Sequence, residues 1–319
     1  MRITIIVNPT SPWSPEDYDN GLLAGSEEMV VLFARELSKK GHDVVVYCSC
    51  HSQSHTDVLF DHGKAINYFD LSLVANKAHQ GILIAFKEPK ALNIDGFEKR
   101  YLWTADCTTL SVQQRRVCDG LFAISEWHKR ELKGCNPGYI DIESIRPGIP
   151  VNKTQEFYTI PKQCLYASSH DRGLKYLLAI WPEILAHHPT ARLKVTYGKT
   201  DLEPVEGVDF LGKLSNEDMD TLYKTSDVLA YPCSGQERYC IVAAKAQIYG
   251  AIPCVVPHMA LQNVVQFGKK FLKKDYLQGM IELLANTSER AAIRSDMTTN
   301  VDFNTWADVV NIWEKILER

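Results

Sequence analysis

The sequence predicts an α/β protein of two domains, each built on a parallel β-sheet. Apolar runs of strand length alternate with amphipathic helical segments along the chain, which is the pattern of βαβ units. The 319 residues suffice for two α/β domains of ordinary size. The segment Pro147–Pro161 contains three prolines and little periodicity, which is typical of a linker. We therefore expect one domain over residues 1–150 and a second over residues 151–319.

The first domain is expected to begin with a strand, a loop rich in Pro, Gly, Asp and Asn, and a helix, over Arg2–Val7, Pro9–Ala24 and about Ser26–Lys40. Further strand candidates in this domain are Asp43–Tyr47, Gly81–Phe86, Arg100–Thr104, Gly120–Ile124 and Asp141–Ile145.

The first helix carries an apolar stripe at helical spacing, made by Met29, Phe33 and Leu37. We expect this stripe to face the core and Gly41 to end the helix. Ser26 has the side chain of a helix cap, and acids follow it in the first turn, where they favour the helix dipole.

The second domain shows the same alternation. Its expected strands are Gln163–Ala167, Arg192–Tyr197 and Val228–Tyr231, with another buried strand before Pro257. Its first expected helix begins at about Arg172 and carries on one face Leu174, Leu177, Leu178, Trp181 and Leu185. The other expected helices are Asn216–Lys224, Tyr239–Tyr249 and, approximately, residues 274–286, 288–297 and 305–317.

The composition is that of a soluble globular protein, with 45% hydrophobic and 23% charged residues. The net charge of −4 argues against a nucleic-acid partner. The start MRITIIVN resembles a strand rather than a signal peptide, and no apolar run approaches the roughly 18 residues of a membrane span. We expect a cytoplasmic protein with weak or no membrane association.

The nine cysteines are scattered and odd in number, which favours free structural thiols in a reducing compartment. Cys48, Cys50 and His51 suggest a metal clip at first sight. The spacing matches no familiar zinc pattern, and we expect Cys48 and Cys50 to point to opposite faces of their strand. Asp17 and Asp19 are better explained as turn acids than as metal ligands. The sequence therefore predicts no metal site.

The stretch Leu211–Pro257 reads LGKLSNEDMDTLYKTSDVLAYPCSGQERYCIVAAKAQIYGAIPCVVP. It resembles the donor-sugar signature of retaining glycosyltransferases of the GT-B fold, glycosyltransferase family 4. The segments GSEEMVVLFARELSKKGHDVVVY, DGLFAISEWHKREL and IRPGIP resemble the same family. The resemblance implies two facing Rossmann-like domains with a cleft between them. The first would bind the acceptor and the second the donor, and the helix at about 305–317 would cross back to the first domain.

The implied activity is transfer of a sugar from a nucleotide-diphosphate donor of UDP or GDP type, with retention of configuration. The acceptor would be a glycan, a lipid-linked molecule or another hydroxyl compound in glycan biosynthesis. No metal ion or other cofactor is expected. Two alternatives remain open: a non-catalytic GT-B binding or partner protein, and a nucleotide-sugar epimerase.

Arg172 follows a predicted strand and precedes a helix, where a guanidinium can fork onto phosphate oxygens. The resemblance implies that Arg172, followed by Gly173, contacts the donor diphosphate; the alternative is a solvated surface arginine. A second arginine that many relatives carry is replaced here by Tyr166 or Ala167. Its phosphate contact is then missing or supplied by other residues, for which Ser168 and Ser169 are candidates.

Glu237 matches the family acid that contacts hydroxyls of the donor sugar, although a Glu before a helix can also be only a capping charge. The four residues after it are expected to present backbone N–H groups to the phosphates: Arg238, Tyr239, Cys240 and Ile241. Relatives usually have Gly where Cys240 stands.

Lys245 replaces the second family acid, which accepts hydrogen bonds from the ribose. A lysine has three donors and no acceptor and cannot make that contact. Three interpretations remain open: altered nucleotide binding, a surface lysine on a shifted helix, or a degraded site. Gly212, Lys213 and Leu214 match a family turn that contacts the nucleobase, and are otherwise a Gly turn before a helix.

Gly21 and Gly25 flank the loop where glycines let the backbone of relatives approach the reaction centre. The alternative is a glycine entry to the capped helix. Asp106 matches an acceptor-side acid of the family, while Ala105 replaces its histidine; a helix-capping role is the alternative for Asp106. His128 is expected to be structural.

Overall fold

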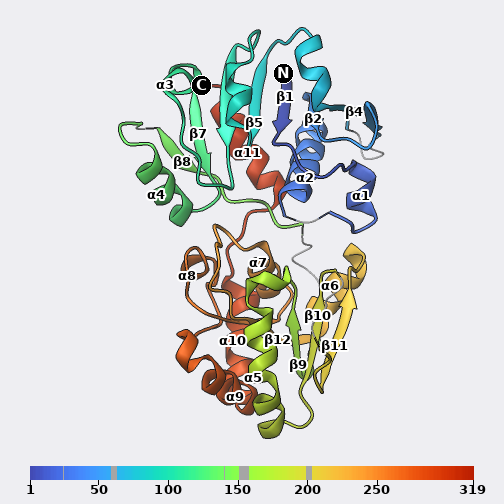
Figure 1. Cartoon of the computed structure of the whole chain (residues 1–319), viewed down its shortest axis with the longest axis vertical. Coiled ribbons are helices and arrows are strands. Elements are labelled where there is room, and N and C mark those ends of the chain that lie inside the picture. The colour runs from blue at the N-terminus through green and yellow to red at the C-terminus, as the bar shows by residue number, and fades with distance from the viewer. Residues whose placement is uncertain (24, 59–62, 140, 151–157, 199–202) are drawn as a thin grey trace. The chain divides into compact units, whose positions relative to one another are not determined.

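The computed structural model describes residues 1–23, 25–58, 63–139, 141–150, 158–198 and 203–319. The chain divides into two compact units (Figure 1). Unit 1 comprises Met1–Pro150 and Asn304–Arg319, and unit 2 comprises Val151–Phe303. Part of the predicted linker, residues 151–157, lies outside the described residues.

Unit 1 is built on an eight-stranded sheet in the order β3-β4-β2-β1-β5-β6-β7-β8, in which only the edge pair β3–β4 is antiparallel. Its strands are β1 (Arg2–Val7), β2 (Asp43–Cys48), β3 (Ser54–Asp57), β4 (Ile66–Asp70), β5 (Ile82–Phe86), β6 (Lys99–Trp103), β7 (Gly120–Ala123) and β8 (Ile142–Ser144). Its helices and 3-10 turns are α1 (Pro15–Asp19), α2 (Ser26–Lys39), η1 (Leu71–Asn76), η2 (Pro89–Asn93), α3 (Val112–Val117), α4 (Glu126–Cys135) and α11 (Trp306–Leu317).

The strands of unit 1 bury both faces. On β6, Leu102 joins an aliphatic cluster with Leu83 and Leu132, whereas the neighbouring Trp103 packs its ring edge-on against Phe33 of α2. This alternation follows from the two-residue period of a strand. Because both faces are covered, the strands read as continuous apolar runs rather than as alternating patterns.

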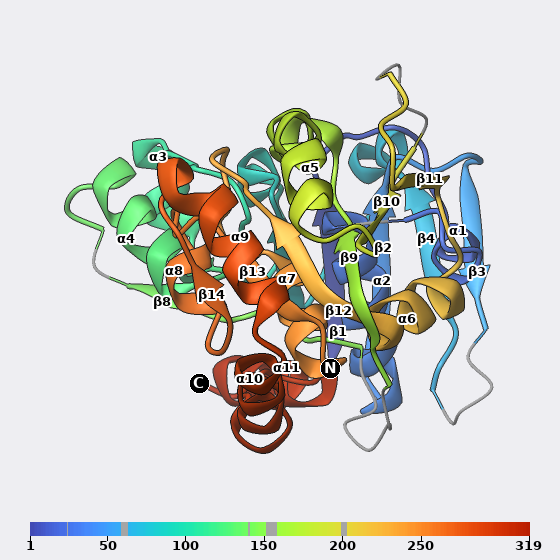
Figure 2. The ribbon, with the colours of Figure 1, turned by 90° about the horizontal axis from the view of Figure 1, so that it is seen from below.

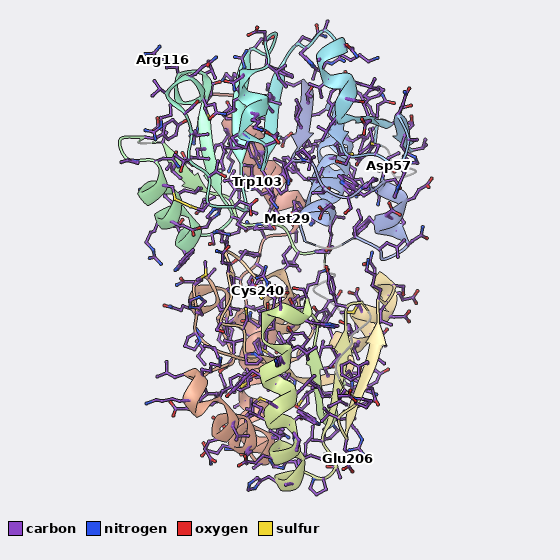
Figure 3. The ribbon with its side chains drawn as sticks, viewed as in Figure 1. Met29, Asp57, Trp103, Arg116, Glu206 and Cys240 are labelled. Carbon is purple, nitrogen blue, oxygen red and sulfur yellow. A yellow bond between two sulfur atoms is a disulfide. The ribbon has the colours of Figure 1, made fainter. Side chains whose placement is uncertain are left out.

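Helix α11 belongs to unit 1 and adds two tryptophans to the aromatic cluster around Trp103. The ring centroids of Trp306 and Trp313 lie 6.4 Å and 5.8 Å from that of Trp103. Figure 3 shows Trp103 and Met29 inside unit 1, with Asp57 and Arg116 towards opposite edges of its sheet. Aromatic contacts of this kind stabilise by about 0.5–1.5 kcal/mol each beyond their buried area.

The predicted stripe of α2 is confirmed, since Met29, Phe33 and Leu37 are all buried. The predicted cap is wrong. Gly25 is the N-cap residue, with a φ of 61°, and Ser26 is the first helical residue. The Ser26 hydroxyl instead accepts a hydrogen bond from Lys87 Nζ at 3.2 Å.

Unit 2 is built on a six-stranded parallel sheet in the order β11-β10-β9-β12-β13-β14. Its strands are β9 (Ile160–Tyr166), β10 (Arg192–Thr196), β11 (Val208–Gly212), β12 (Ser226–Tyr231), β13 (Ile252–Val255) and β14 (Lys269–Lys270). Its helices and 3-10 turns are η3 (His170–Arg172), α5 (Leu174–His187), α6 (Asn216–Thr225), α7 (Ile241–Ile248), α8 (Leu261–Val264), η4 (Lys273–Asp275), α9 (Tyr276–Ala285) and α10 (Thr287–Asn300).

Helix α5 lies over one side of strands β9 and β12 (Figure 2). Its predicted apolar face is confirmed at four buried positions: Leu174, Leu177, Leu178 and Trp181. Leu185, the fifth predicted position, is only half-buried. Near the end of α5, Ile184 is buried in the core instead of Leu185.

The elements that the sequence did not predict are short or polar. Strands β3 (SHTD) and β14 (two lysines) carry no apolar run, and β4 and β11 alternate exposed with more buried positions over five residues. They pair because a neighbouring strand supplies the hydrogen bonds, which is a tertiary effect that local composition does not reveal.

The cysteines differ from the expectation in two places. Cys107 and Cys135 form a disulfide, visible in Figure 3, so not every cysteine is a free thiol. The Asn136 side chain holds the loop after Cys107 against the end of α4, since it accepts from Leu110 N at 2.8 Å and donates to Thr108 O at 2.7 Å. The expectation that Cys48 and Cys50 point to opposite faces is wrong: residues two apart along an extended chain share a face, and the two Sγ atoms lie 3.3 Å apart.

Candidate functional site

Each sheet has one point where the strand order reverses direction. In unit 2 it lies between β9 and β12, and in unit 1 between β1 and β5. Loops at the carboxyl ends of such neighbouring strands diverge, and ligands of open α/β sheets bind there. The two residues that the sequence singles out for catalysis in unit 2, Arg172 and Glu237, lie in the loops that follow β9 and β12.

Arg172 and Glu237 form an ion pair. Arg172 Nη1 donates to Glu237 Oε1 at 2.6 Å, and it also contacts the backbone oxygen of Gln236. The Arg172 side chain is 31% exposed, whereas that of Glu237 is 11% exposed. The guanidinium therefore keeps one side open to solvent while it is held by the carboxylate.

Two further groups fix Glu237. The buried Tyr231 hydroxyl donates to Glu237 Oε1 at 2.8 Å, and the backbone N–H of Glu237 contacts Met259 Sδ at 3.4 Å. Burial raises the pKa of Glu237, and the hydrogen bond from Tyr231 and the charge of Arg172 oppose that rise. Burial is the largest single effect on the pKa of Arg172 and lowers it, but the Glu237 carboxylate and other neighbouring groups together raise it above the ordinary value. The attraction between the two side chains favours the charged form of each, and for Glu237 burial outweighs it.

The turn before α5 requires Gly173. Its φ is 103°, and a Cβ atom at this position would lie 2.7 Å from the backbone oxygen of Pro232. The loop after β9 thus approaches the loop after β12 backbone to backbone. Ser168 Oγ lies 3.3 Å from the Tyr231 hydroxyl, and the Ser169 carbonyl accepts from Tyr166 OH at 2.7 Å. Of the two serines, only the Ser168 side chain joins the hydrogen-bonded group around Glu237.

Helix α7 begins two residues later than predicted, at Ile241, so Arg238 and Tyr239 precede it. Arg238 donates to Gln236 Oε1 at 3.2 Å, and Tyr239 is buried. Cys240 is the N-cap residue in the left-handed conformation, with a φ of 78° that favours glycine. Figure 3 labels Cys240 within unit 2.

Lys245 lies in the last turn of α7 and is half-buried. Lys245 therefore lies on the helix that starts beside Glu237, just over one turn after the N-terminus of that helix. The lysine side chain has no acceptor oxygen of the kind that a carboxylate would offer at this position.

Gly212 ends β11, and its carbonyl accepts from Tyr197 N at 2.8 Å. Lys213 is exposed and Leu214 is half-buried. Tyr197 follows β10 with a φ of 86° and is 43% exposed. An aromatic side chain in the left-handed region with its ring in solvent is costly, and such strain concentrates at functional positions.

In unit 1 the acceptor-side candidates are joined by a residue that the sequence did not indicate. Lys87 follows β5 with a φ of 58°, and its Nζ lies 3.3 Å from Asp106 Oδ2 and 3.2 Å from Ser26 Oγ. It thereby connects Asp106 with the start of α2, next to Gly25. Gly21 lies separately after α1, with a φ of 68°. The buried His128 has a structural contact with the same loop, since its Nε2 lies 3.0 Å from Asp106 O.

Sequence reasoning missed four residues of these groups. Tyr231 and Met259 read as ordinary apolar positions of buried segments. Lys87 and Tyr197 directly follow strands, which is a usable signal, but their left-handed conformation is visible only in the structure. No group of three His, Cys, Asp or Glu side chains among the described residues could hold a metal ion. In the same part of the chain, no helix has the length and apolar character to cross a membrane.

Neither protein-family models nor curated protein sequences yield a match. Solved structures do. Over 99% of this chain and 98% of its own length, the sucrose-phosphate synthase from Thermosynechococcus elongatus superposes with a TM-score of 0.74 at 12% identity. All residues of this chain and 98% of HepE from Anabaena, solved with UDP and glucose, align with a TM-score of 0.68 at 15% identity. The glycosyltransferase WaaG, involved in lipopolysaccharide biosynthesis, matches with a TM-score of 0.67 at 13% identity over 99% of both chains.

The chain has the GT-B fold. The predicted fold class is thereby confirmed: the parallel-sheet units described above are those of GT-B glycosyltransferases. At 12–15% identity the likeness concerns the fold, and the roles of individual residues have to be argued from their chemistry.

Proposed function

We propose that this protein is a retaining, metal-independent glycosyltransferase that moves a sugar from a nucleotide-diphosphate donor to a hydroxyl acceptor. The observation that carries the proposal is the pairing of Arg172 with Glu237 at the strand reversal of unit 2. One residue can neutralise charge on a leaving diphosphate, and the other can accept hydrogen bonds from sugar hydroxyls. The two groups come from different loops, and a buried tyrosine hydroxyl holds Glu237 in place.

The donor would bind at the carboxyl edge of the unit 2 sheet. Arg172 and the N-terminus of α7 would stabilise the diphosphate. The turn at Gly212, Lys213 and Leu214 and the exposed ring of Tyr197 would receive the nucleobase, since stacking on an aromatic face is worth about 1–3 kcal/mol per base. HepE was solved with UDP and glucose, which favours UDP as the first donor nucleotide to test.

The acceptor would bind unit 1 near Gly21, Gly25 and Asp106. Lys87 would orient the Asp106 carboxylate towards an acceptor hydroxyl. With the leaving phosphate itself helping to deprotonate the acceptor, no strong side-chain base is required, and Ala105 is compatible with turnover.

The test is a screen of UDP- and GDP-sugars for released nucleoside diphosphate, with and without added glycan acceptors, on the parent protein and on Arg172→Ala. We expect release that requires an acceptor, persists in chelator and falls at least about a hundredfold in the variant, as for loss of a charged stabilising group. Arg192→Ala is the matched control, because Arg192 begins β10 and its Nη1 bonds only the carbonyls of Pro189 and Ala191 among the described residues. Release that needs manganese would contradict metal independence.

A non-catalytic binding protein of the same fold is the second candidate. It is favoured by Lys245, which offers no acceptor for the ribose, and by the ion pair in which Arg172 and Glu237 already engage each other. Tight nucleotide binding without release of diphosphate from any donor would support this candidate, and release without an acceptor would support an epimerase-type or hydrolytic reaction instead.

A further inference from the structure

Two cysteine side chains of unit 1 meet at the end of β2. Cys48 is the last residue of β2, and Cys50 forms a bridge with Trp13. Their sulfur atoms lie 3.3 Å apart, and both are free thiols. A disulfide needs about 2.05 Å, so only a small approach separates the pair from a covalent bond. Cys48 is fully buried and Cys50 is half-buried, so one sulfur of the pair is accessible to a reagent.

The two thiols differ in acidity because each is the other's hydrogen-bond partner. The Cys48 thiol lowers the pKa of Cys50, against the opposing effects of burial and of the Asp70 carboxylate. The same contact, together with burial, raises the pKa of Cys48. The more accessible sulfur is therefore the better nucleophile, which is the arrangement of an attacking and a resolving cysteine.

We propose that Cys48 and Cys50 form a reversible intramolecular disulfide by exchange with a small-molecule disulfide such as oxidised glutathione. The Cys50 thiolate attacks one sulfur of the reagent, forms a mixed disulfide and releases one glutathione thiolate. Cys48 then loses its proton to water and attacks Cys50 Sγ, which releases the second glutathione thiolate. The protein dithiol is oxidised, the reagent is reduced to two thiols, and no other oxidant is needed.

The residue between the two cysteines holds the loop that follows β1. Ser49 Oγ accepts from Thr10 N at 3.1 Å, and Ser49 O accepts from Trp13 N at 2.9 Å. Cys50 N donates to Asp70 Oδ2 at 3.3 Å and anchors the far side of the segment. The new bond closes a small ring that contains the backbone of Ser49, so we expect it to shift the peptide groups on either side of that residue. We expect both hydrogen bonds to the loop to weaken.

This loop lies at the strand reversal of unit 1, between β1 and α1, and continues towards Gly21 and Gly25. An effect of oxidation on acceptor use would follow from the proposed function and depends on it. The disulfide and its effect on the loop do not, and the experiment therefore measures these two.

The full chain is equilibrated at neutral pH in glutathione buffers of graded ratio, alkylated and digested with trypsin. The tryptic peptide 41–64 contains Cys48 and Cys50 and no other cysteine. We expect it to become lighter by two hydrogen atoms and to resist alkylation as the buffer becomes oxidising. Hydrogen exchange on the same samples should show Thr10 and Trp13 amides exchanging about tenfold faster, a loss of about 1.4 kcal/mol of protection.

Cys50→Ser and Cys48→Ser serve as matched controls, since each retains the other six free thiols and the Cys107–Cys135 disulfide. Neither variant should show faster exchange at Thr10 and Trp13 in oxidising buffer. The proposal is overturned if peptide 41–64 stays a dithiol or stops at a glutathione adduct at every ratio. It is equally overturned if the disulfide forms while exchange at both amides is unchanged, or if Cys50→Ser responds like the parent.

Discussion

At the scale of single residues, the donor side of unit 2 combines two kinds of position. Arg172 and Glu237 have ordinary backbone conformations, and what distinguishes them is the partly buried ion pair between their side chains. Tyr197 and Cys240 are unusual in conformation, because both occupy the left-handed region without being glycine. A left-handed φ costs a residue other than glycine about 1–2 kcal/mol. A side chain that persists there is either supported by packing, as the buried Cys240 is, or exposed, as Tyr197 is.

Tyr197 offers a test in which stability and binding move in opposite directions. Tyr197→Gly removes the strain, so we expect the free energy of unfolding to stay equal or to rise by up to about 1 kcal/mol. The same change removes the stacking face, so the affinity for UDP should fall about 5- to 150-fold. Urea denaturation and isothermal titration measure the two effects. Tyr197→Phe keeps the ring and should retain both properties; UDP binding that is insensitive to Tyr197→Gly would exclude the ring from the nucleobase site.

At the scale of elements, the strand–turn–helix connection β9–α5 places the arginine. Gly173 lets the loop turn at a φ of 103° against the carbonyl of Pro232. The Arg172 guanidinium reaches Glu237 only because this turn brings the two loops together. The position of the charge is therefore a property of the connection as well as of the residue.

Gly173→Ala should damage both stability and binding. The new Cβ would lie 2.7 Å from a backbone oxygen in a conformation that alanine disfavours, so we expect a loss of about 1–3 kcal/mol in the free energy of unfolding. Gly235→Ala is the control within the same pair of loops. A Cβ there would meet Arg172 Cδ at 3.8 Å, an ordinary contact, and should cost less than about 0.5 kcal/mol. Equal melting temperatures of the two variants would show that the loops adjust freely.

Helix α7 carries the departure at Lys245, and charge distinguishes its interpretations. If the ammonium group contributes to diphosphate binding, Lys245→Ala removes a charged hydrogen bond worth about 1.5–3 kcal/mol. Titration with UDP and GDP should then show binding about ten- to a hundredfold weaker, and Lys245→Glu should be as harmful or worse. In a degraded site, Lys245→Ala binds like the parent and Lys245→Glu binds more tightly, because the ribose regains an acceptor.

Strongly periodic elements could be predicted from the sequence, and contacts between elements could not. The stripe of α2 and the apolar face of α5 follow from helical spacing, and both are buried where expected except at Leu185. Arg172 and Glu237 were found as separate candidates 65 residues apart, but their pairing depends on β9 and β12 being neighbours. Local sequence does not encode strand order, which arises from packing of the whole sheet.

At the scale of the whole molecule, backbone strain follows the carboxyl edges of the sheets. Five residues other than glycine have a positive φ in the described part of the chain: Lys87, Lys162, Tyr197, Cys240 and Met259. Four of them lie after strands, and only Lys162 lies inside one, in β9. Since such conformations reduce stability, the presence of three of them after strands of the unit 2 sheet indicates that this edge is shaped for binding rather than for folding.

The pH dependence of stability tests this conclusion for the buried acid of unit 2. Because burial raises the pKa of Glu237, the folded protein keeps this proton at pH values where the unfolded chain has lost it. The folded state then binds more protons than the unfolded state. This group therefore lowers the free energy of unfolding progressively as the pH rises from about 4.5 through the raised pKa. Above that pKa, the reduction in the free energy of unfolding stays constant. Glu237→Gln does not titrate. Urea denaturation between pH 4 and pH 8 (about one-unit steps suffice for one titrating group) should therefore show the variant gaining on the parent with rising pH and then reaching a plateau.

Asp70 supplies a control of opposite sign, because its hydrogen bonds with Ser72 lower its pKa. The contribution of Asp70 to stability is present above the ordinary value of 3.8 and is lost as the pH falls through the lowered pKa. Asp70→Asn should therefore be less stable than the parent at neutral pH, and this difference should disappear in acid. When the measurements are extended below the ordinary value of 3.8, the two variants must diverge from the parent in opposite directions as the pH rises. A Glu237→Gln curve that runs parallel to the parent at every pH would mean that the carboxylate is accommodated without cost, and that the buried pair with Arg172 serves folding rather than a ligand.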